Sequence, residues 1–212
     1  MARSIMDAAK LAQASYKPHL ITSPQITDSL DQGGVQAHLC SDGTLLLPGS
    51  NSLLDYAHFN LRVFNVGGKK YRLSAKSTER GASGTVWHQG FLKYSKAVFD
   101  WVGSRKPKLI IGHSLGAAAA QILSKSWNRH AIGFAAPRPK STGGPVAHAD
   151  KCLLICRVDD VVCSLTPGFH HLGDARFLEP ESVNWGGDHS MKNYIRILSK
   201  NKGPDRIPAR WG

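Results

Sequence analysis

The sequence predicts an α/β fold in which a mostly parallel central sheet is flanked by helices. Two observations carry this prediction. Short apolar runs typical of buried strands alternate with longer stretches whose apolar residues recur at helical spacing. One such run, residues 109–111, passes through Gly-His-Ser-Leu-Gly at 112–116 into an alanine-rich helix. With 212 residues and 42% hydrophobic content, the chain can build one sizeable core, so we expect residues 1–212 to form a single domain.

The first half of the chain is expected to supply a helix and two hairpins. Apolar residues recur at helical spacing from Ser4 to Tyr16, with Ser4 as a candidate N-cap and Pro18 beyond the helix end. The expected hairpins join 35–40 to 44–47 across an Asp-Gly turn, and 61–66 to 70–75 across Gly67-Gly68. Residues 78–85 are rich in turn-forming residues.

The second half is expected to alternate helices and central strands. The expected elements are a helix over 90–104, the strand at 109–111, a helix ending near 128, strands at 131–136, 153–158 and 175–178, and a closing helix over 191–199. The tail from residue 201 has no clear pattern. This order of elements around one serine corresponds to an α/β hydrolase-like plan.

The segment 112–116 matches the pattern G-x-S-x-G with Ser114 at its centre. At a sharp strand-to-helix turn, glycines two residues away on either side leave room where strand and helix crowd together. Such a turn exposes the serine hydroxyl close to a helix N-terminus, which favours developing negative charge. We therefore expect Ser114 to be a nucleophile.

A serine nucleophile needs a base and an acid that orients the base. In this kind of fold both follow the serine, on loops after later strands. Asp159 and Asp160 end the strand at 153–158, and one of them can face the site because side chains alternate along an extended chain. His189, just before the closing helix, is the expected base. The other histidines are less suitable in position, namely His88, His113, His170 and His171.

Composition restricts the compartment and the partners. The first ten residues include Asp7 and Lys10, which a secretory signal would lack, and no run approaches the roughly 20 apolar residues of a membrane span. We therefore expect a cytoplasmic protein, with a secreted form not excluded. In one strand, Cys152 and Cys156 would stand roughly 13 Å apart, too far to bridge. Free buried thiols are expected at all four cysteines, the others being Cys40 and Cys163.

The formal net charge is +12, spread along the sequence. This charge attracts anionic surfaces such as acidic lipid, although an ordinary solvated surface explains it as well. No specific nucleic-acid partner is predicted, and the oligomeric state is left open. No Cys/His spacing suggests a metal site, and no cofactor is implied.

With these residues in hand, the chain resembles the class 3 lipases, the family of fungal triacylglycerol lipases and their bacterial relatives. The stretches that carry the resemblance are Ala12-Gln-Ala-Ser-Tyr16, Val86-Trp-His-Gln-Gly-Phe-Leu92, Gly112-His-Ser-Leu-Gly-Ala117, Gly133-Phe-Ala-Ala-Pro-Arg138, Asp160-Val-Val-Cys-Ser-Leu-Thr-Pro167 and His189. Each stretch alone is a weak match to the family, but the order and spacing of all of them together make the match specific. The resemblance implies an α/β-hydrolase fold, here small with a short or absent lid.

The resemblance also implies roles for particular residues. It favours Asp160 over Asp159 as the acid, and it makes Ser50 and the backbone N–H of Leu115 the oxyanion-hole donors. Two departures are evident: Pro48 stands where the family usually has arginine, and only 29 residues separate the acid from His189. The segment similar to the family's lid supplies candidates for the lid or acyl pocket, although core packing explains them equally: Leu53, Leu54, Tyr56 and Phe59.

Together these residues predict a serine carboxylic-ester hydrolase, a lipase or esterase, with Ser114, Asp160 and His189 as its triad. Two alternatives remain open at this point. A basic binding module on a hydrolase fold would have no need of all three residues. A phospholipase or acyltransferase acting on anionic lipid would use the same residues.

Overall fold

The computed structural model describes residues 2–49, 63–66, 68–74, 76–183, 189–200 and 207–212. The strands of its central sheet are β2 (Ile26–Gln32), β3 (Val35–Cys40), β4 (Thr44–Leu47), β9 (Leu109–His113), β10 (His130–Phe134), β11 (Cys152–Arg157) and β12 (Asp174–Leu178). Their order is β12-β11-β10-β9-β4-β3-β2. Pairing is parallel from β12 to β4 and antiparallel from β4 to β2. The predicted mostly parallel sheet is confirmed.

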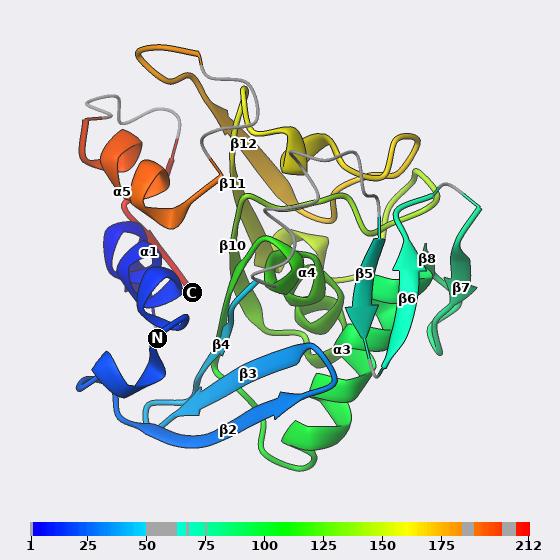
Figure 1. The fold of residues 1–212 in the computed structure, drawn as a ribbon, viewed down its shortest axis with the longest axis horizontal. Helices are drawn as coiled ribbons and strands as arrows, with labels where there is room; N and C mark the ends of the chain where they lie inside the picture. The colour runs from blue at the N-terminus through cyan, green and yellow to red at the C-terminus, as the bar shows by residue number, and fades with distance from the viewer. Residues whose placement is uncertain (1, 50–62, 67, 75, 184–188, 201–206) are drawn as a thin grey trace.

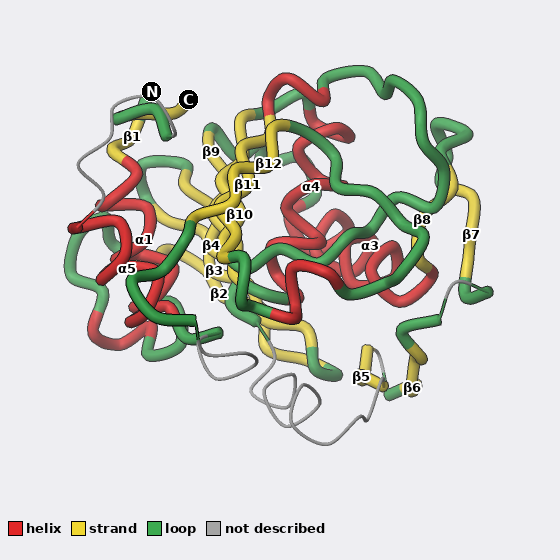
Figure 2. Tube along the Cα trace, turned by 90° about the horizontal axis from the view of Figure 1, so that it is seen from above, coloured by secondary structure: helices red, strands yellow, loops and turns green. Residues whose placement is uncertain are grey.

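Helices cover both faces of this sheet. They are α1 (Ile5–Ala14), α3 (Gln89–Val102), α4 (Leu115–Trp127) and α5 (Met191–Lys200). Seen from above in Figure 2, α1 and α5 lie on one side of the sheet and α3 and α4 on the other, and Figure 1 shows the same two pairs. None of the helices in the described part of the chain combines the length and hydropathy that a bilayer crossing requires.

The core lies between the sheet and these two helical layers. Every residue of β9 and β11 is buried, as expected for central parallel strands covered on both faces. The alanines at 117–120 are fully buried, since α4 packs its small side chains directly onto the sheet. This close packing brings the N-terminus of α4 to the carboxyl end of β9.

Three two-stranded ladders lie outside the central sheet. They are β5 (Val63–Val66) with β6 (Lys69–Arg72), β7 (Thr78–Arg80) with β8 (Val86–His88), and β1 (Arg3–Ser4) with β13 (Arg210–Trp211). The last pair brings the two ends of the chain side by side, as Figure 1 and Figure 2 both show. Short 3-10 helices at Pro18–Leu20, Ala149–Lys151 and Val161–Ser164 complete the described elements.

The expected central strands and helices are present, with boundaries shifted by a few residues. α1 ends at Ala14, well before Pro18, and Ser4 caps it by accepting a 3.0 Å hydrogen bond from the Asp7 N–H. All four cysteines are free and buried, as predicted.

Two short ladders and an edge strand were not predicted. β2 is the edge strand that pairs with β3, and its half-buried face carries Ile26, Asp28 and Leu30. Asp28 interrupts the apolar pattern of this face, and its carboxylate forms an exposed ion pair with Arg105. Residues 78–85, predicted to be turn-rich, begin with β7 and lead through a turn into β8, and the end of the tail, where the sequence has no clear pattern, forms β13.

Candidate active site

Ser114 stands at the sharp turn between β9 and α4. Its backbone has φ 57° and ψ −123°, a region that costs energy for any residue with a side chain. A Cβ on Gly112 would lie 2.5 Å from the carbonyl oxygen of Gly116, and one on Gly116 would collide with the Leu47 carbonyl at the end of β4. Both glycines are therefore required where β9, α4 and β4 meet.

His189 lies directly against Ser114 although 75 residues separate them. Its Nε2 is 2.8 Å from Ser114 Oγ, and its Nδ1 is 2.9 Å from Oδ2 and 3.1 Å from Oδ1 of Asp160. A proton on Nδ1, held by the carboxylate, leaves the Nε2 lone pair facing the serine hydroxyl, which donates to it. The structure thus brings together the three residues that the sequence placed on separate loops.

Asp160 is held by more than the histidine. It follows β11, where its Oδ1 accepts a 3.0 Å hydrogen bond from the Val162 N–H and its Oδ2 accepts a 2.9 Å bond from the Tyr194 hydroxyl. Burial opposes ionisation of this carboxyl, but attraction to His189 and the hydrogen bonds from His189, Tyr194 and the Val162 N–H together hold its pKa below the ordinary value. Asp160 is therefore a buried anion whose lone pairs are directed at His189 and Tyr194.

Asp159, the alternative acid, is directed elsewhere. Its carboxylate forms a two-point ion pair with Arg157, with Nε to Oδ1 at 3.0 Å and Nη2 to Oδ2 at 2.9 Å. Both side chains are at most 1% exposed. As the alternation of an extended chain implies, the two adjacent aspartates face different partners, and it is Asp160 that contacts His189.

The loop after β4 also borders Ser114. A Cβ on Gly49 would stand 2.7 Å from the Ser114 Cβ, so the backbone just before Ser50 passes against the nucleophile. Leu115 is the first residue of α4, where the helix offers its backbone N–H no acceptor. The remaining predicted residues of this region lie outside the described residues: Ser50, Leu53, Leu54, Tyr56 and Phe59.

Two further side chains adjoin this site, and the sequence analysis placed neither in it. The Tyr16 hydroxyl lies 2.5 Å from Nδ1 of His113 and accepts a 2.8 Å hydrogen bond from the Gly49 N–H. His113 Nε2 is 3.0 Å from the carbonyl oxygen of His189, and the two imidazole rings are 4.8 Å apart. One signal was available, because a tyrosine that continues an apolar pattern needs a hydrogen-bond partner for its hydroxyl once it is buried.

The side chains of His88 and His171, two of the histidines judged less suitable as the base, bind backbone carbonyls. His88 Nε2 is 2.8 Å from the Arg72 carbonyl oxygen, and His171 Nε2 is 2.8 Å from that of Ala136. His170 joins a backbone bridge with Lys140. Within the described ranges, no group of three or more histidine, cysteine, aspartate or glutamate side chains is arranged to hold a metal ion.

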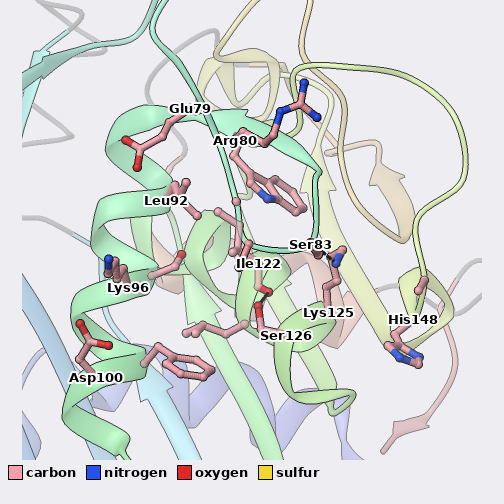
Figure 3. A pocket seen from close by; sticks show the side chains of 17 residues that line it. Glu79, Arg80, Ser83, Leu92, Lys96, Asp100, Ile122, Lys125, Ser126 and His148 are labelled. Carbon is pink, nitrogen blue, oxygen red and sulfur yellow. Dashed lines mark hydrogen bonds between the residues drawn. The ribbon is translucent and has the colours of Figure 1, made fainter.

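A cavity of about 590 Å³ opens on the other side of α4, between that helix, α3 and the β7-β8 ladder (Figure 3). Its lining includes Trp87 and Ile122, with Lys125 directed toward the Ser83 hydroxyl at 2.6 Å. The cavity contacts the C-terminal half of α4, whereas Ser114 precedes its N-terminus. It is therefore separate from the Ser114 site.

A mostly parallel sheet with helices on both faces and a serine elbow at the end of a central strand defines an α/β-hydrolase fold, and in particular a lipase-like one. The chain is similar to the crystal structure of Lip2 lipase from Yarrowia lipolytica, with 15% identity and a TM-score of 0.52 over 82% of this chain and 77% of that one. It is similar to nonglycosylated Yarrowia lipolytica LIP2 lipase, with 14% identity and a TM-score of 0.53 over 84% and 82%.

At this level of identity the similarity shows a shared fold. No family model matches the sequence, and no curated protein matches it. What the protein does must therefore be argued from its own site.

Proposed function

We propose that the protein is a serine carboxylic-ester hydrolase, a lipase or esterase related to the class 3 lipases. The observation that carries the proposal is the 2.8 Å contact between Ser114 Oγ and His189 Nε2, with Asp160 on the far side of the same imidazole. A binding protein gains nothing from a strained serine hydrogen-bonded to a histidine-aspartate pair, whereas acyl transfer requires this arrangement.

The proposed reaction proceeds through an acyl-enzyme. His189 Nε2 takes the Ser114 proton as Oγ attacks the ester carbonyl carbon, and Asp160 stabilises the resulting imidazolium. The Leu115 N–H, together with Ser50, donates to the oxyanion of the tetrahedral intermediate. The intermediate expels the alcohol with the proton from His189. Water, deprotonated by His189, then releases the carboxylic acid and restores Ser114.

The proposed substrate class is an ester or a lipid. Ser114 is only 1% exposed, so the expectation that the turn exposes its hydroxyl was wrong, and an ester reaches Oγ after neighbouring groups move. The net charge of +12 favours an anionic lipid surface, which makes a phospholipase or acyltransferase acting on such lipid the second candidate. For that candidate, turnover on phosphatidylglycerol vesicles should fall steeply with added salt, whereas indifference to salt would exclude it.

Turnover of p-nitrophenyl esters from short to long acyl chains tests the proposal. We expect the wild-type protein to hydrolyse part of this panel, and Ser114→Ala to lose at least about 1,000-fold in kcat while folding normally. Ser126→Ala is the matched control, because its hydroxyl donates a 2.8 Å hydrogen bond to the Ile122 carbonyl one turn earlier in the same helix, α4. Full activity in Ser114→Ala, or none in the wild type on any ester, would refute the proposal.

A further inference from the structure

One hydrogen-bond chain connects two sides of the Ser114 site that are far apart in sequence. At one end the Gly49 N–H contacts the Tyr16 hydroxyl at 2.8 Å, and Tyr16 Oη lies 2.5 Å from Nδ1 of His113. At the other end His113 Nε2 lies 3.0 Å from the His189 carbonyl oxygen. The chain therefore runs from the loop before Ser50 to the backbone of the proposed base.

The chemistry of the two end groups sets the direction of every link. The Gly49 N–H can only donate, so Tyr16 Oη accepts there. The His189 carbonyl can only accept, so His113 Nε2 carries the proton. In the neutral ring Nδ1 is then an acceptor for the Tyr16 hydroxyl proton, so this one tautomer satisfies all four groups at once, whereas the opposite tautomer would leave the link between Nε2 and the His189 carbonyl without a proton.

Burial keeps both middle members of this chain uncharged. Burial, reinforced by the proximity of His189, lowers the pKa of His113 to about 3, and burial raises the pKa of Tyr16 above its ordinary value. A neutral ring matters here because its centre is 4.8 Å from that of His189. A cationic His113 would oppose the imidazolium that His189 becomes during the proposed reaction.

We propose that Tyr16 and His113 are positioning residues for ester hydrolysis. They hold the Gly49 loop and the His189 backbone at fixed positions on either side of Ser114. This inference rests on the proposed function. Among the described residues, no hydrogen bond joins either side chain to Ser114 Oγ or to His189 Nε2. Tyr16 fixes how closely the loop that leads into Ser50 approaches Ser114. His113 fixes the position of the His189 backbone, from which the imidazole reaches Ser114 Oγ.

Tyr16→Phe keeps the ring and removes only the hydroxyl, which breaks two of the three links. We expect kcat per labelled Ser114 to fall about 10- to 100-fold with KM within about twofold, since small misplacements of reacting groups cost this much. Tyr94→Phe is the matched control. The buried Tyr94 hydroxyl donates mainly to the Gln36 carbonyl at 2.6 Å, with a long 3.4 Å contact to the Pro48 carbonyl. The kcat of the Tyr94→Phe variant should stay within about twofold of wild type.

An unchanged kcat in Tyr16→Phe, or equal losses in both variants, would overturn the inference. His113→Gln breaks the chain from its other end and serves if Tyr16→Phe does not fold; its kcat should fall with KM preserved.

A second measurement does not depend on turnover. Nitrogen-15 spectra of the wild-type protein, assigned by comparison with His113→Gln, should show His113 neutral, with the proton on Nε2, down to about pH 4. A proton on Nδ1 would overturn the chain whatever the activity. A wild-type protein that neither labels with a fluorophosphonate nor turns over esters would instead refute the proposed function, and the spectra would still decide whether the chain exists.

Discussion

The Tyr194 hydroxyl donates a 2.9 Å hydrogen bond to Oδ2 of Asp160, the same oxygen that lies 2.9 Å from His189 Nδ1. Tyr194 Oη also accepts a 3.1 Å hydrogen bond from the Arg157 N–H at the end of β11. A side chain of α5 thus holds the same carboxylate oxygen that contacts the histidine.

Tyr194→Phe should therefore affect both stability and catalysis. It leaves the buried Arg157 N–H without this acceptor and frees one lone pair of Asp160, which should cost about 1–2 kcal/mol of unfolding free energy. We expect kcat to fall about threefold to tenfold, because Asp160 gains freedom to rotate. Urea unfolding and ester turnover measure the two effects. A variant with wild-type values in both would show that the hydroxyl has no such role.

Asp159 and Asp160 should respond in opposite ways to the same substitution. Asp160→Asn should lower kcat about 1,000- to 10,000-fold with little loss of stability, since an amide cannot hold the imidazole in the required tautomer. Asp159→Asn should destabilise the fold by about 3–5 kcal/mol, because it removes the anionic side of a two-point ion pair whose side chains are at most 1% exposed. The folded fraction of Asp159→Asn should keep its activity. The reverse pattern would assign the acid to Asp159.

Acidification should destabilise the protein in a window set by His113. Its pKa is lowered by burial and by His189 from 6.5 to about 3, so between these values the unfolded chain binds a proton that the folded chain does not. Stability is thus fully present above about pH 6.5 and declines toward pH 3, by up to about 1.4 kcal/mol per pH unit for this group. His38 and His88, whose pKa values are also lowered by burial, add to the decline.

Urea unfolding at several pH values measures this slope. His113→Gln should make it shallower by close to one proton, since glutamine does not titrate. An unchanged slope in that variant would mean that His113 is not the buried neutral base described here.

Gly49→Ala tests the approach of the loop to the nucleophile. Its new methyl would stand 2.7 Å from both Ser114 Cβ and Tyr16 Oη, so the loop must shift, at a cost of about 1–3 kcal/mol and about 100-fold in kcat. Gly143→Ala is the control, because its methyl would meet only His170 Nε2, at 3.9 Å. Equal behaviour of the two variants would place Gly49 away from Ser114.

Local sequence patterns predicted the elements that bear on Ser114, because those elements are defined by neighbours in the chain. The apolar run at 109–111 is buried in β9. The glycines at 112 and 116 are needed because the backbone is crowded there, and the G-x-S-x-G spacing alone indicates this crowding. The edge strand β2 was missed because a charged residue occupies its half-buried face.

The surroundings of the site could not be predicted in the same way. Tyr16 and His113 are 97 residues apart in the sequence, and only the packing of α1 against the sheet brings them together. Likewise, the alternation of side chains along an extended chain predicted that Asp159 and Asp160 face different ways. It could not predict that Asp159 forms the ion pair with Arg157 and that Asp160 contacts His189.

The most direct test of the account is to treat the wild-type protein with a fluorophosphonate and to locate the adduct by peptide mass spectrometry. This reagent reacts with a serine that a neighbouring base has activated. The account predicts a single adduct on Ser114 that is lost in His189→Gln, since the 2.8 Å contact between these residues is then broken. An adduct on another serine, or labelling of Ser114 that persists unchanged in His189→Gln, would contradict it.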